Sequence, residues 1–275
     1  MQKTLRKTTA KETLAIVNKG LYINQKNEKI YIRKIQEEAV NGTMYHSSSE
    51  LEDILYALQL KSIHKTIFEV VEETTIKSIQ RLTSSGFSNP MCLNFASAKN
   101  PGGGFFNGAQ AQEESIARSS GLYPCQLAAI EFYETHRGMK SCMYTDGMIY
   151  SPKVPVLRND KGELFDTPIV SSIITAASVN AGVVKRFEAD KVSKIEDVMR
   201  VRIDKLLALS ITNNHNALIL GAWGCGVFQN DPKMIAGLFS ELLKGKYRGV
   251  FEKVVFAIYA KSDKYLKAFQ NEFER

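Results

Sequence analysis

Two adjacent glutamates follow a run of three glycines near the middle of the chain. The glycines occupy positions 102–104, and Gln112, Glu113 and Glu114 come after a spacer of seven residues. Glycine has no Cβ, so such a run can take positive φ angles, and its free N–H groups can form an anion-binding nest. Near a bound diphosphate, burial and like charge favour a protonated carboxyl group, which can donate to a leaving oxygen. The spacing therefore predicts a phosphate cradle that presents an acid to its ligand.

A second uncharged glycine loop occupies residues 221–228 and follows the apolar run at 217–220. Neither loop contains a lysine, so backbone amides would hold the phosphates in both. Phe228, which follows the last glycine closely, can offer an aromatic face to an adenine or a ribose. Trp223 is instead expected to pack in the core. Two such loops suit a diphosphate that is clamped from both sides.

These loops differ from the common nucleotide-binding motifs. Neither contains Gly-Lys-Ser or Gly-Lys-Thr, and Asn107 stands where a Gly-x-Gly-x-x-Gly run from Gly102 would need its last glycine. No set of Mg²⁺ ligands accompanies them, which disfavours a phosphotransferase. The four cysteines form no Cys-x-x-Cys pair and the four histidines are scattered, so we expect no metal site and no cofactor. Reduced thiols in the cytoplasm are the simplest account of these cysteines.

The composition limits the class of protein and its partners. With 44% hydrophobic residues the chain can bury a sizeable core. No apolar run approaches the roughly 20 residues that span a bilayer, so no membrane partner is expected. The net charge of +7 suits a polyanionic partner. Because the basic residues are spread along the chain without aromatic interleaving, we expect no dedicated nucleic-acid site.

Short apolar runs alternate with amphipathic segments through most of the chain. This pattern predicts strands at 66–71, 91–96, 148–150, 154–157, 169–175, 217–220 and 254–259, and helices at 74–82, 194–210, 232–243 and 263–269, with a further helix from Gln112. The fold class is therefore α/β, with a mostly parallel or mixed sheet covered by helices on both faces. In such sheets ligands bind beyond the carboxyl ends of the strands, where both glycine loops are expected.

The first part of the chain has a different pattern. A helix, a short two-stranded hairpin and a second helix at 51–60 are predicted there, and the residues from Ser47 to Glu50 offer an N-cap for the second helix. We expect residues 1–62 to form an accessory extension packed on a core of residues 63–275.

The residues from Asn94 to Gly104, followed by Gln112 to Glu114, resemble the signature of bacterial-type poly(ADP-ribose) glycohydrolases. These macrodomain proteins carry GGG, a spacer of six to eight residues, and QEE, and Gly224 to Phe228 resembles their second, diphosphate-binding loop. The resemblance implies a three-layer macrodomain with a mixed central sheet and an N-terminal extension. It also implies hydrolysis of the ribose–ribose O-glycosidic bonds of poly(ADP-ribose), in an exo mode, with ADP-ribose as the product.

The resemblance further implies a role for each motif residue. Glu114 would protonate the leaving ribose oxygen and later activate water, and Glu113 would hold ribose hydroxyls and orient the bond. The remaining residues would bind substrate, with Asn100 and Gln112 at the distal ribose, Gly102, Gly103 and Gly104 along the distal ribose and diphosphate, Gly224, Cys225, Gly226 and Val227 around the diphosphate, and Phe228 at the proximal ribose or adenine. Because the transition state is oxocarbenium-like, one positioned carboxyl group can serve without a metal.

Two other functions remain open from the sequence. A macrodomain can bind ADP-ribose without cleaving it, although binding alone does not need an acid. The same cradle would also serve a hydrolase that removes mono-ADP-ribose from a modified protein or nucleic acid. The expected partner is therefore poly(ADP-ribose) or another ADP-ribosylated macromolecule.

Overall fold

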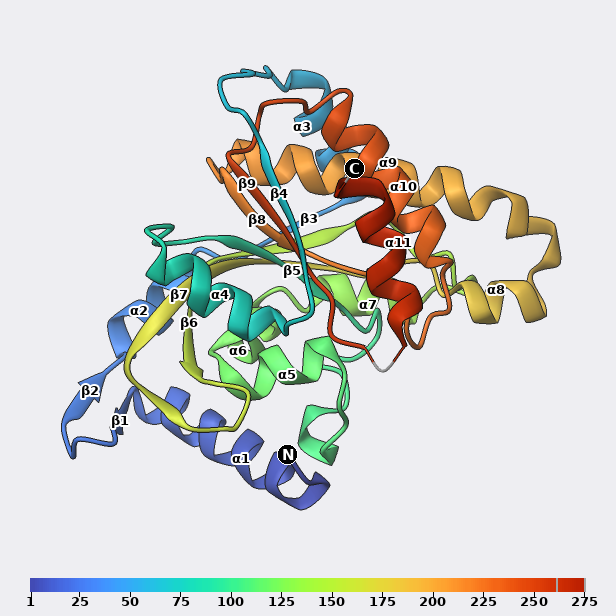
Figure 1. Ribbon diagram of the computed structural model, residues 1–275. Helices are drawn as coiled ribbons and strands as arrows, with labels where there is room; N and C mark the ends of the chain where they lie inside the picture. The colour runs from blue at the N-terminus through green and yellow to red at the C-terminus, as the bar shows by residue number, and fades with distance from the viewer. Residues whose placement is uncertain (261, 275) are drawn as a thin grey trace.

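A seven-stranded mixed sheet forms the centre of the computed structural model, which describes residues 1–260 and 262–274 (Figure 1). Its strands are β3 (Met44–His46), β4 (Ile67–Val71), β5 (Met91–Phe95), β6 (Met148–Arg158), β7 (Leu164–Ala176), β8 (Ala217–Leu220) and β9 (Lys253–Ala257), in the order β3-β6-β7-β5-β8-β9-β4. The five strands from β7 to β4 are parallel, and β6 and β3 are added antiparallel at one side. The carboxyl ends of β7, β5, β8 and β9 therefore meet at one edge.

Side chains alternate between the two faces of this sheet. In β5, Met91 and Leu93 pack into one hydrophobic cluster and Cys92 packs into another, and all three are fully buried. Strands β8 and β9 alternate in the same way. Because both faces are covered, these strands are mostly apolar, as parallel strands in α/β proteins usually are.

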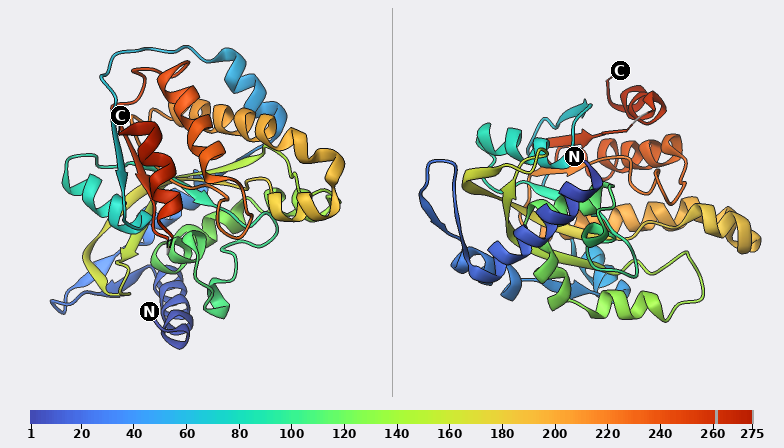
Figure 2. Two further views of the ribbon diagram at one scale, coloured as in Figure 1. Left: turned by 45° about the vertical axis from the view of Figure 1, so that its right-hand side comes forward. Right: turned by 90° about the horizontal axis from the view of Figure 1, so that it is seen from below.

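Helices cover both faces of the sheet, as Figure 2 shows from two sides. The helices are α1 (Lys3–Lys19), α2 (Arg33–Asn41), α3 (Ser48–Ala57), α4 (Thr75–Ser84), α5 (Gln112–Ser119), α6 (Leu122–Ala128), α7 (Glu131–Arg137), α8 (Ala181–Phe187), α9 (Ile195–Thr212), α10 (Pro232–Lys244) and α11 (Asp263–Phe273). Residues of α9, α10 and α11 pack on one face, and those of α2, α4, α5 and α6 pack on the other. Two short 3₁₀ helices, η1 (Phe105–Asn107) and η2 (Ala189–Lys194), complete the helical elements.

Polar side chains fix where several helices begin. Ser47 and Glu50 form a capping box at α3, in which the Glu50 carboxylate accepts the Ser47 N–H at 2.7 Å. The Thr74 hydroxyl accepts the Lys77 N–H at 3.1 Å and caps α4. These residues satisfy N–H groups that the first helical turn leaves without a partner.

The N-terminal residues are joined to the sheet and to the helices around the glycine loop. Strands β1 (Leu21–Ile23) and β2 (Lys29–Tyr31) form the predicted hairpin, and β3 adds a strand to the main sheet beside β6. Seen from below, α1 lies across α5, which it contacts (Figure 2). The division at residue 62 remains a prediction, and the segment before it completes one side of the central sheet.

Most predicted elements are confirmed, but strand β3 was not predicted, and further differences concern β6 and four of the helices. The strands predicted at 148–150 and 154–157 are one strand, β6, whose register shifts between Ser151 and Val154 and whose Lys153 has φ 45°. Helices α2, α6, α7 and α8 were not predicted; the last three are only seven residues long and give little periodic signal. Arg158 is buried, and its guanidinium donates to Thr13 at 3.0 Å and to the Gly162 carbonyl at 2.7 Å.

Within the described residues, no helix has both the length and the apolar character needed to cross a membrane.

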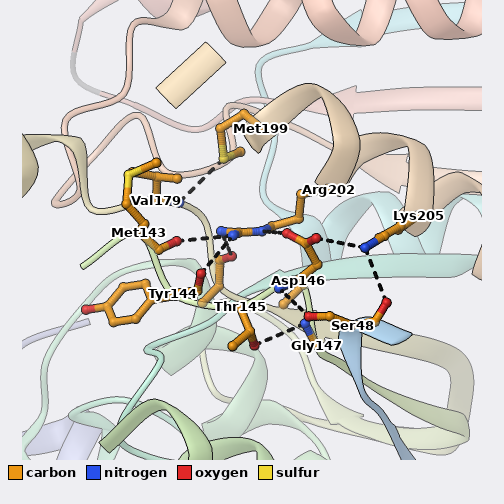
Figure 3. Close-up of polar contacts among 12 residues, drawn as sticks. Ser48, Met143, Tyr144, Thr145, Asp146, Gly147, Val179, Met199, Arg202 and Lys205 are labelled. Atoms are coloured by element: carbon orange, nitrogen blue, oxygen red, sulfur yellow. Dashed lines mark hydrogen bonds and ion pairs between the residues drawn. The ribbon is translucent and has the colours of Figure 1, made fainter. Parts of the chain in front are cut away.

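Two buried cations of α9 hold the loop before β6 (Figure 3). Arg202 donates through Nε to Asp146 at 3.1 Å, and Lys205 donates to the other oxygen of Asp146 at 2.8 Å. Arg202 also donates to the carbonyls of Ala177 at 2.9 Å and Met143 at 3.1 Å. One guanidinium therefore ties α9 to the end of β7 and to the loop that leads into β6.

We expect Arg202→Met to lower the free energy of unfolding by about 3–5 kcal/mol, because it leaves a mostly buried Asp146 short of one partner and two carbonyls unpaired. Arg200→Met on the same helix is the matched control; its ion pairs are far more exposed, so the loss should be about 1 kcal/mol or less. Urea unfolding followed by circular dichroism measures both. Equal losses in the two variants would contradict this account of the cluster.

Candidate active site

The two glycine loops begin at neighbouring strands of the sheet. Strands β5 and β8 pair in parallel, with Cys92 opposite Ile219, so both loops leave from the same edge, as predicted. Their first residues are in contact, because a Cβ on Gly221 would lie 3.1 Å from the Phe95 ring. The sheet therefore brings together two segments that are more than a hundred residues apart in the sequence.

Gly103 is the point where the first loop meets both glutamates. Its φ of 57° lies in the left-handed region, which favours glycine. A Cβ at this position would collide with Oε1 of Glu114 and would lie 3.0 Å from Oε2 of Glu113. The loop can approach the two carboxylates this closely only because residue 103 has no side chain.

Glu114 closes the loop onto the start of α5. Its Oε1 accepts the Gly104 N–H at 3.0 Å, and its Oε2 accepts the Ala111 N–H at 2.9 Å. The second bond is the half of a capping box in which the third helical residue reaches back to the N-cap. The side chain is half-buried, and an ionised carboxylate offers about four lone-pair positions, so acceptor capacity remains for a ligand.

Glu113 points the other way, into the protein, because successive helical residues are turned by about 100°. Only 3% of its surface is exposed. Its Oε2 accepts the Ser97 N–H at 2.7 Å, and its Oε1 accepts from the amides of Gln126 at 3.1 Å and Asn94 at 3.3 Å. Glu113 thus joins α5 to α6, to β5 and to the loop that follows β5.

Burial raises the pKa of Glu113 from its ordinary value of 4.5 to about 8, against the opposing effect of these hydrogen bonds. The amide oxygens of Asn94 and Gln126 are buried and lack a partner within the described part of the chain. Turning the Gln126 amide by 180° would place its oxygen against Glu113. That oxygen would accept from the protonated carboxyl group, so the surroundings can hold Glu113 in either protonation state.

Gln112 anchors the first turn of α5 to the sheet. Its amide oxygen accepts the Phe95 N–H at 2.9 Å, and its amide nitrogen donates to the Leu93 carbonyl at 2.7 Å and to Thr75 at 3.1 Å. The side chain is therefore engaged by protein groups, and it fixes the helix on which both glutamates lie. Asn100 is exposed at the mouth of the loop, and its carbonyl accepts the Gly103 N–H at 3.0 Å.

The second glycine loop presents backbone N–H groups that other parts of the protein do not use. Among the residues described, the N–H groups of Gly226, Val227 and Phe228 have no hydrogen-bond acceptor, whereas that of Cys225 donates to the Ala222 carbonyl at 3.1 Å. Three successive free N–H groups suit an anion. A Cβ on Gly226 would meet no atom within 4 Å, so the backbone is open to a ligand there.

The side chains of this loop face in different directions. Trp223 is fully buried and donates to the Ala176 carbonyl at 3.2 Å, which confirms the expectation of core packing. Cys225 is also buried, so only its backbone can face a ligand, and burial raises the pKa of its thiol to about 12. Val227 is 81% exposed, and Phe228 is half-buried with its ring 6.2 Å from that of Tyr144.

The family model of the microbial-type PARG (poly(ADP-ribose) glycohydrolase) catalytic domain matches residues 10–159 of this chain. The chain belongs to the microbial-type PARG family. No curated protein matches it.

Solved PARG structures have the same fold as this protein over nearly its whole length. The poly(ADP-ribose) glycohydrolase of Thermomonospora curvata is 39% identical, with a TM-score of 0.94 over 98% of this chain and 100% of that one. The same enzyme bound to the inhibitor ADP-HPD gives 38% identity and a TM-score of 0.92 over the same shares. The Deinococcus radiodurans enzyme in complex with ADP-ribose is 38% identical, with a TM-score of 0.83 over 89% of this chain and 98% of that one. The predicted macrodomain-like α/β fold is confirmed by these likenesses.

Several residues around the PARG motif were missed by the sequence reasoning. Asn94 carried a usable signal, because it is a polar residue inside the apolar strand β5. Ser97, Gln126 and Tyr144 carried none, since they reach the site only through the folding of loops and of the short helix α6. No cluster of three or more His, Cys, Asp and Glu side chains in the described ranges is arranged to hold a metal ion.

The pKa of Glu113 makes the stability of this PARG domain depend on pH. The folded protein binds the Glu113 proton more tightly than the unfolded chain, so its contribution to stability is full below pH 4.5 and is lost as pH rises towards 8. Compared with Glu113→Gln, the wild-type unfolding free energy should fall across that window by up to about 1.4 kcal/mol per pH unit. Urea unfolding at a series of pH values measures the difference. Parallel pH profiles for the two proteins would show that Glu113 titrates normally.

Proposed function

We propose that this protein hydrolyses the ribose–ribose O-glycosidic bonds of poly(ADP-ribose), with Glu114 as general acid and then general base. The observation that carries the proposal is the contact of both glutamates with the backbone at Gly103 and Gly104, beside a nest of free N–H groups. Membership of the PARG family supports the same chemistry. Binding of ADP-ribose alone would not require a second carboxylate at the loop.

The substrate's diphosphate would lie at the second loop, on the N–H groups of Gly226, Val227 and Phe228. Negative charge is favoured there because these successive N–H groups have no acceptor among the described residues. The distal ribose would then reach the first loop, where the lack of side chains leaves room for it. The proposed substrate-binding residues are Asn100, Gly102, Gly103, Gly104, Gln112, Gly224, Cys225, Gly226, Val227 and Phe228, with Gln112 acting by fixing α5.

The two glutamates would have separate roles in bond cleavage. Protonated Glu114 donates its proton to the leaving ribose oxygen as the bond from that oxygen to the anomeric carbon breaks. The positive charge that develops on the distal ribose is stabilised by the nearby diphosphate. The Glu114 carboxylate then removes a proton from the attacking water, which restores the acid. Glu113 holds ribose hydroxyls, and its three hydrogen bonds to Ser97, Asn94 and Gln126 fix its position.

The proposed mode of action is exo, with release of ADP-ribose from a chain end. Support comes from the rings of Phe228 and Tyr144, which lie beside the free N–H groups and can wall off the adenosine side of the ligand. Arg202 holds the Tyr144 loop through the carbonyls of Met143 and Tyr144 (Figure 3). A cytoplasmic location is proposed as well, because Cys92, Cys125, Cys142 and Cys225 are all free thiols.

Glu114→Gln should bind ADP-ribose nearly as the wild type does and should hydrolyse the polymer about 10²–10⁴-fold more slowly, because the amide has nearly the same size but cannot supply the proton. The amide oxygen can accept only one of the two N–H groups, of Gly104 and Ala111, that the carboxylate accepts. Release of ADP-ribose from labelled polymer and calorimetric binding of ADP-ribose measure the two effects. Glu134→Gln, on an exposed face of α7, is the control and should keep full activity. Normal turnover by Glu114→Gln would refute the assignment.

The exo mode predicts the order in which products appear. During the first few per cent of the reaction, free ADP-ribose should be the main small product while the polymer shortens gradually. Gel separation of the remaining chains and chromatography of the released material measure this distribution. Oligomers that appear ahead of monomer would instead show internal cleavage.

A further inference from the structure

Helix α1 carries a row of three lysines that the proposed chemistry does not use. Lys3, Lys7 and Lys11 follow one another at intervals of four, so they lie on one face of the helix. All three are exposed. No acidic residue stands in the first turn of α1, so the row begins without a compensating charge.

This row lies against the loop that carries the first glycines. A Cβ on Gly108 would lie 2.7 Å from the Lys3 carbonyl and 3.0 Å from Cγ of Lys7, so the lysine stems pack on the tip of the loop. Arg6, on the same helix, donates to the Gly108 carbonyl at 2.8 Å and to the side chain of Gln110 at 2.6 Å. Figure 1 shows the start of α1 beside this loop, ahead of α5.

The tip of the loop is also close to Glu114. The segment from Gly104 to Ala111 forms a tight turn whose two ends are both held by the Glu114 carboxylate. Within it, the Ala109 N–H donates to the Gly104 carbonyl at 3.2 Å. Gly108 is four positions after Gly104, so their Cα atoms are at most about 14 Å apart even if fully extended. Lys3 and Lys7 therefore pack on a short loop whose two ends are held by the proposed acid.

The positive charge of the row is not neutralised by the protein. Of the ion pairs found in residues 1–260 and 262–274, just one involves α1, and it joins Glu12 to Arg158 at 3.3 Å. The lysine ammonium groups are thus available to an anion from outside. Helix α1 has no aromatic residue on which a nucleic-acid base could stack, so the row offers charge without base recognition.

We propose that Lys3, Lys7 and Lys11 bind the diphosphate of the polymer unit that follows the scissile bond. This inference rests on the proposed function. The oxygen that leaves at Glu114 belongs to the adenosine ribose of that next unit, and its diphosphate is attached to the same adenosine. The product ADP-ribose lacks this unit, so the lysine row distinguishes the polymer from its product.

The test compares Lys3→Gln/Lys7→Gln/Lys11→Gln with Lys61→Gln/Lys65→Gln/Arg248→Gln. The control removes the same charge from exposed residues that precede β4 and β9, at the edge of the sheet opposite the glycine loops. Both triples are also made in the Glu114→Gln background, where binding of labelled polymer is measured without turnover. Binding of ADP-ribose is measured in parallel by calorimetry.

We expect the α1 triple to weaken polymer binding about tenfold at low salt and to reduce the slope of log affinity against log salt by about 1–2. In the active background its KM for polymer should rise with little change in kcat, and the Kd for ADP-ribose should not change. The conservative triple Lys3→Arg/Lys7→Arg/Lys11→Arg should restore binding. A control triple that weakens binding equally, or an α1 triple that binds polymer normally, would overturn the proposal.

Three further outcomes separate this proposal from its alternatives. Loss of ADP-ribose binding in the α1 triple would overturn the proposal, because it would place the lysines in the site already described. The α1 triple could also bind polymer normally but lose binding of a single-stranded nucleic acid of similar charge. That result would overturn the proposal and assign the row to nucleic acid. If the wild type bound polymer through the row but never cleaved it, the proposed function would fail while this inference stood.

Discussion

The absence of a side chain at Gly103 is the constraint on which the site depends. The loop backbone turns there with a positive φ and lies beside two carboxylates that leave no room for a Cβ. Because Glu114 binds both the loop at Gly104 and the helix start at Ala111, the loop and α5 form one unit. The sheet then sets this unit beside the second loop through the pairing of β5 with β8. Together these contacts fix where Glu114, the proposed acid, lies relative to the second loop.

The two glutamates differ in environment although they are adjacent in the sequence. Glu113 turns towards β5 and is buried, which raises its pKa to about 8, whereas Glu114 turns towards the loop and stays half-buried. Burying a carboxyl group is unfavourable unless it is well hydrogen-bonded or protonated. The amides of Asn94 and Gln126 meet this need, and their unpartnered oxygens provide for the protonated form. The hydrogen bonds from Ser97, Asn94 and Gln126 therefore fix the orientation of this buried carboxyl group.

Local features of the site were predictable from the sequence, and features that depend on distant contacts were not. The glycine loops could be placed because each directly follows an apolar strand, and β8 was found at its exact limits. The raised pKa of Glu113 could not be predicted, because the side that each helical residue faces is set by the docking of α5 on β5. The burial of Arg158 and Arg202 could not be predicted from the sequence either, because their partners come from distant segments. Likewise, nothing in the spacing of the α1 lysines indicated that Gly108 would pack against them.

The central claim concerns the distal ribose, whose glycosidic bond is cleaved. It should lie between the first glycine loop and Glu114, with its diphosphate on the second loop. A crystal structure of Glu114→Gln with a short poly(ADP-ribose) fragment tests this most directly. The account predicts the glycosidic oxygen within hydrogen-bond distance of residue 114, and phosphate oxygens on the N–H groups of Gly226, Val227 and Phe228. A fragment whose glycosidic oxygen lies away from residue 114, or whose diphosphate lies elsewhere, would contradict it.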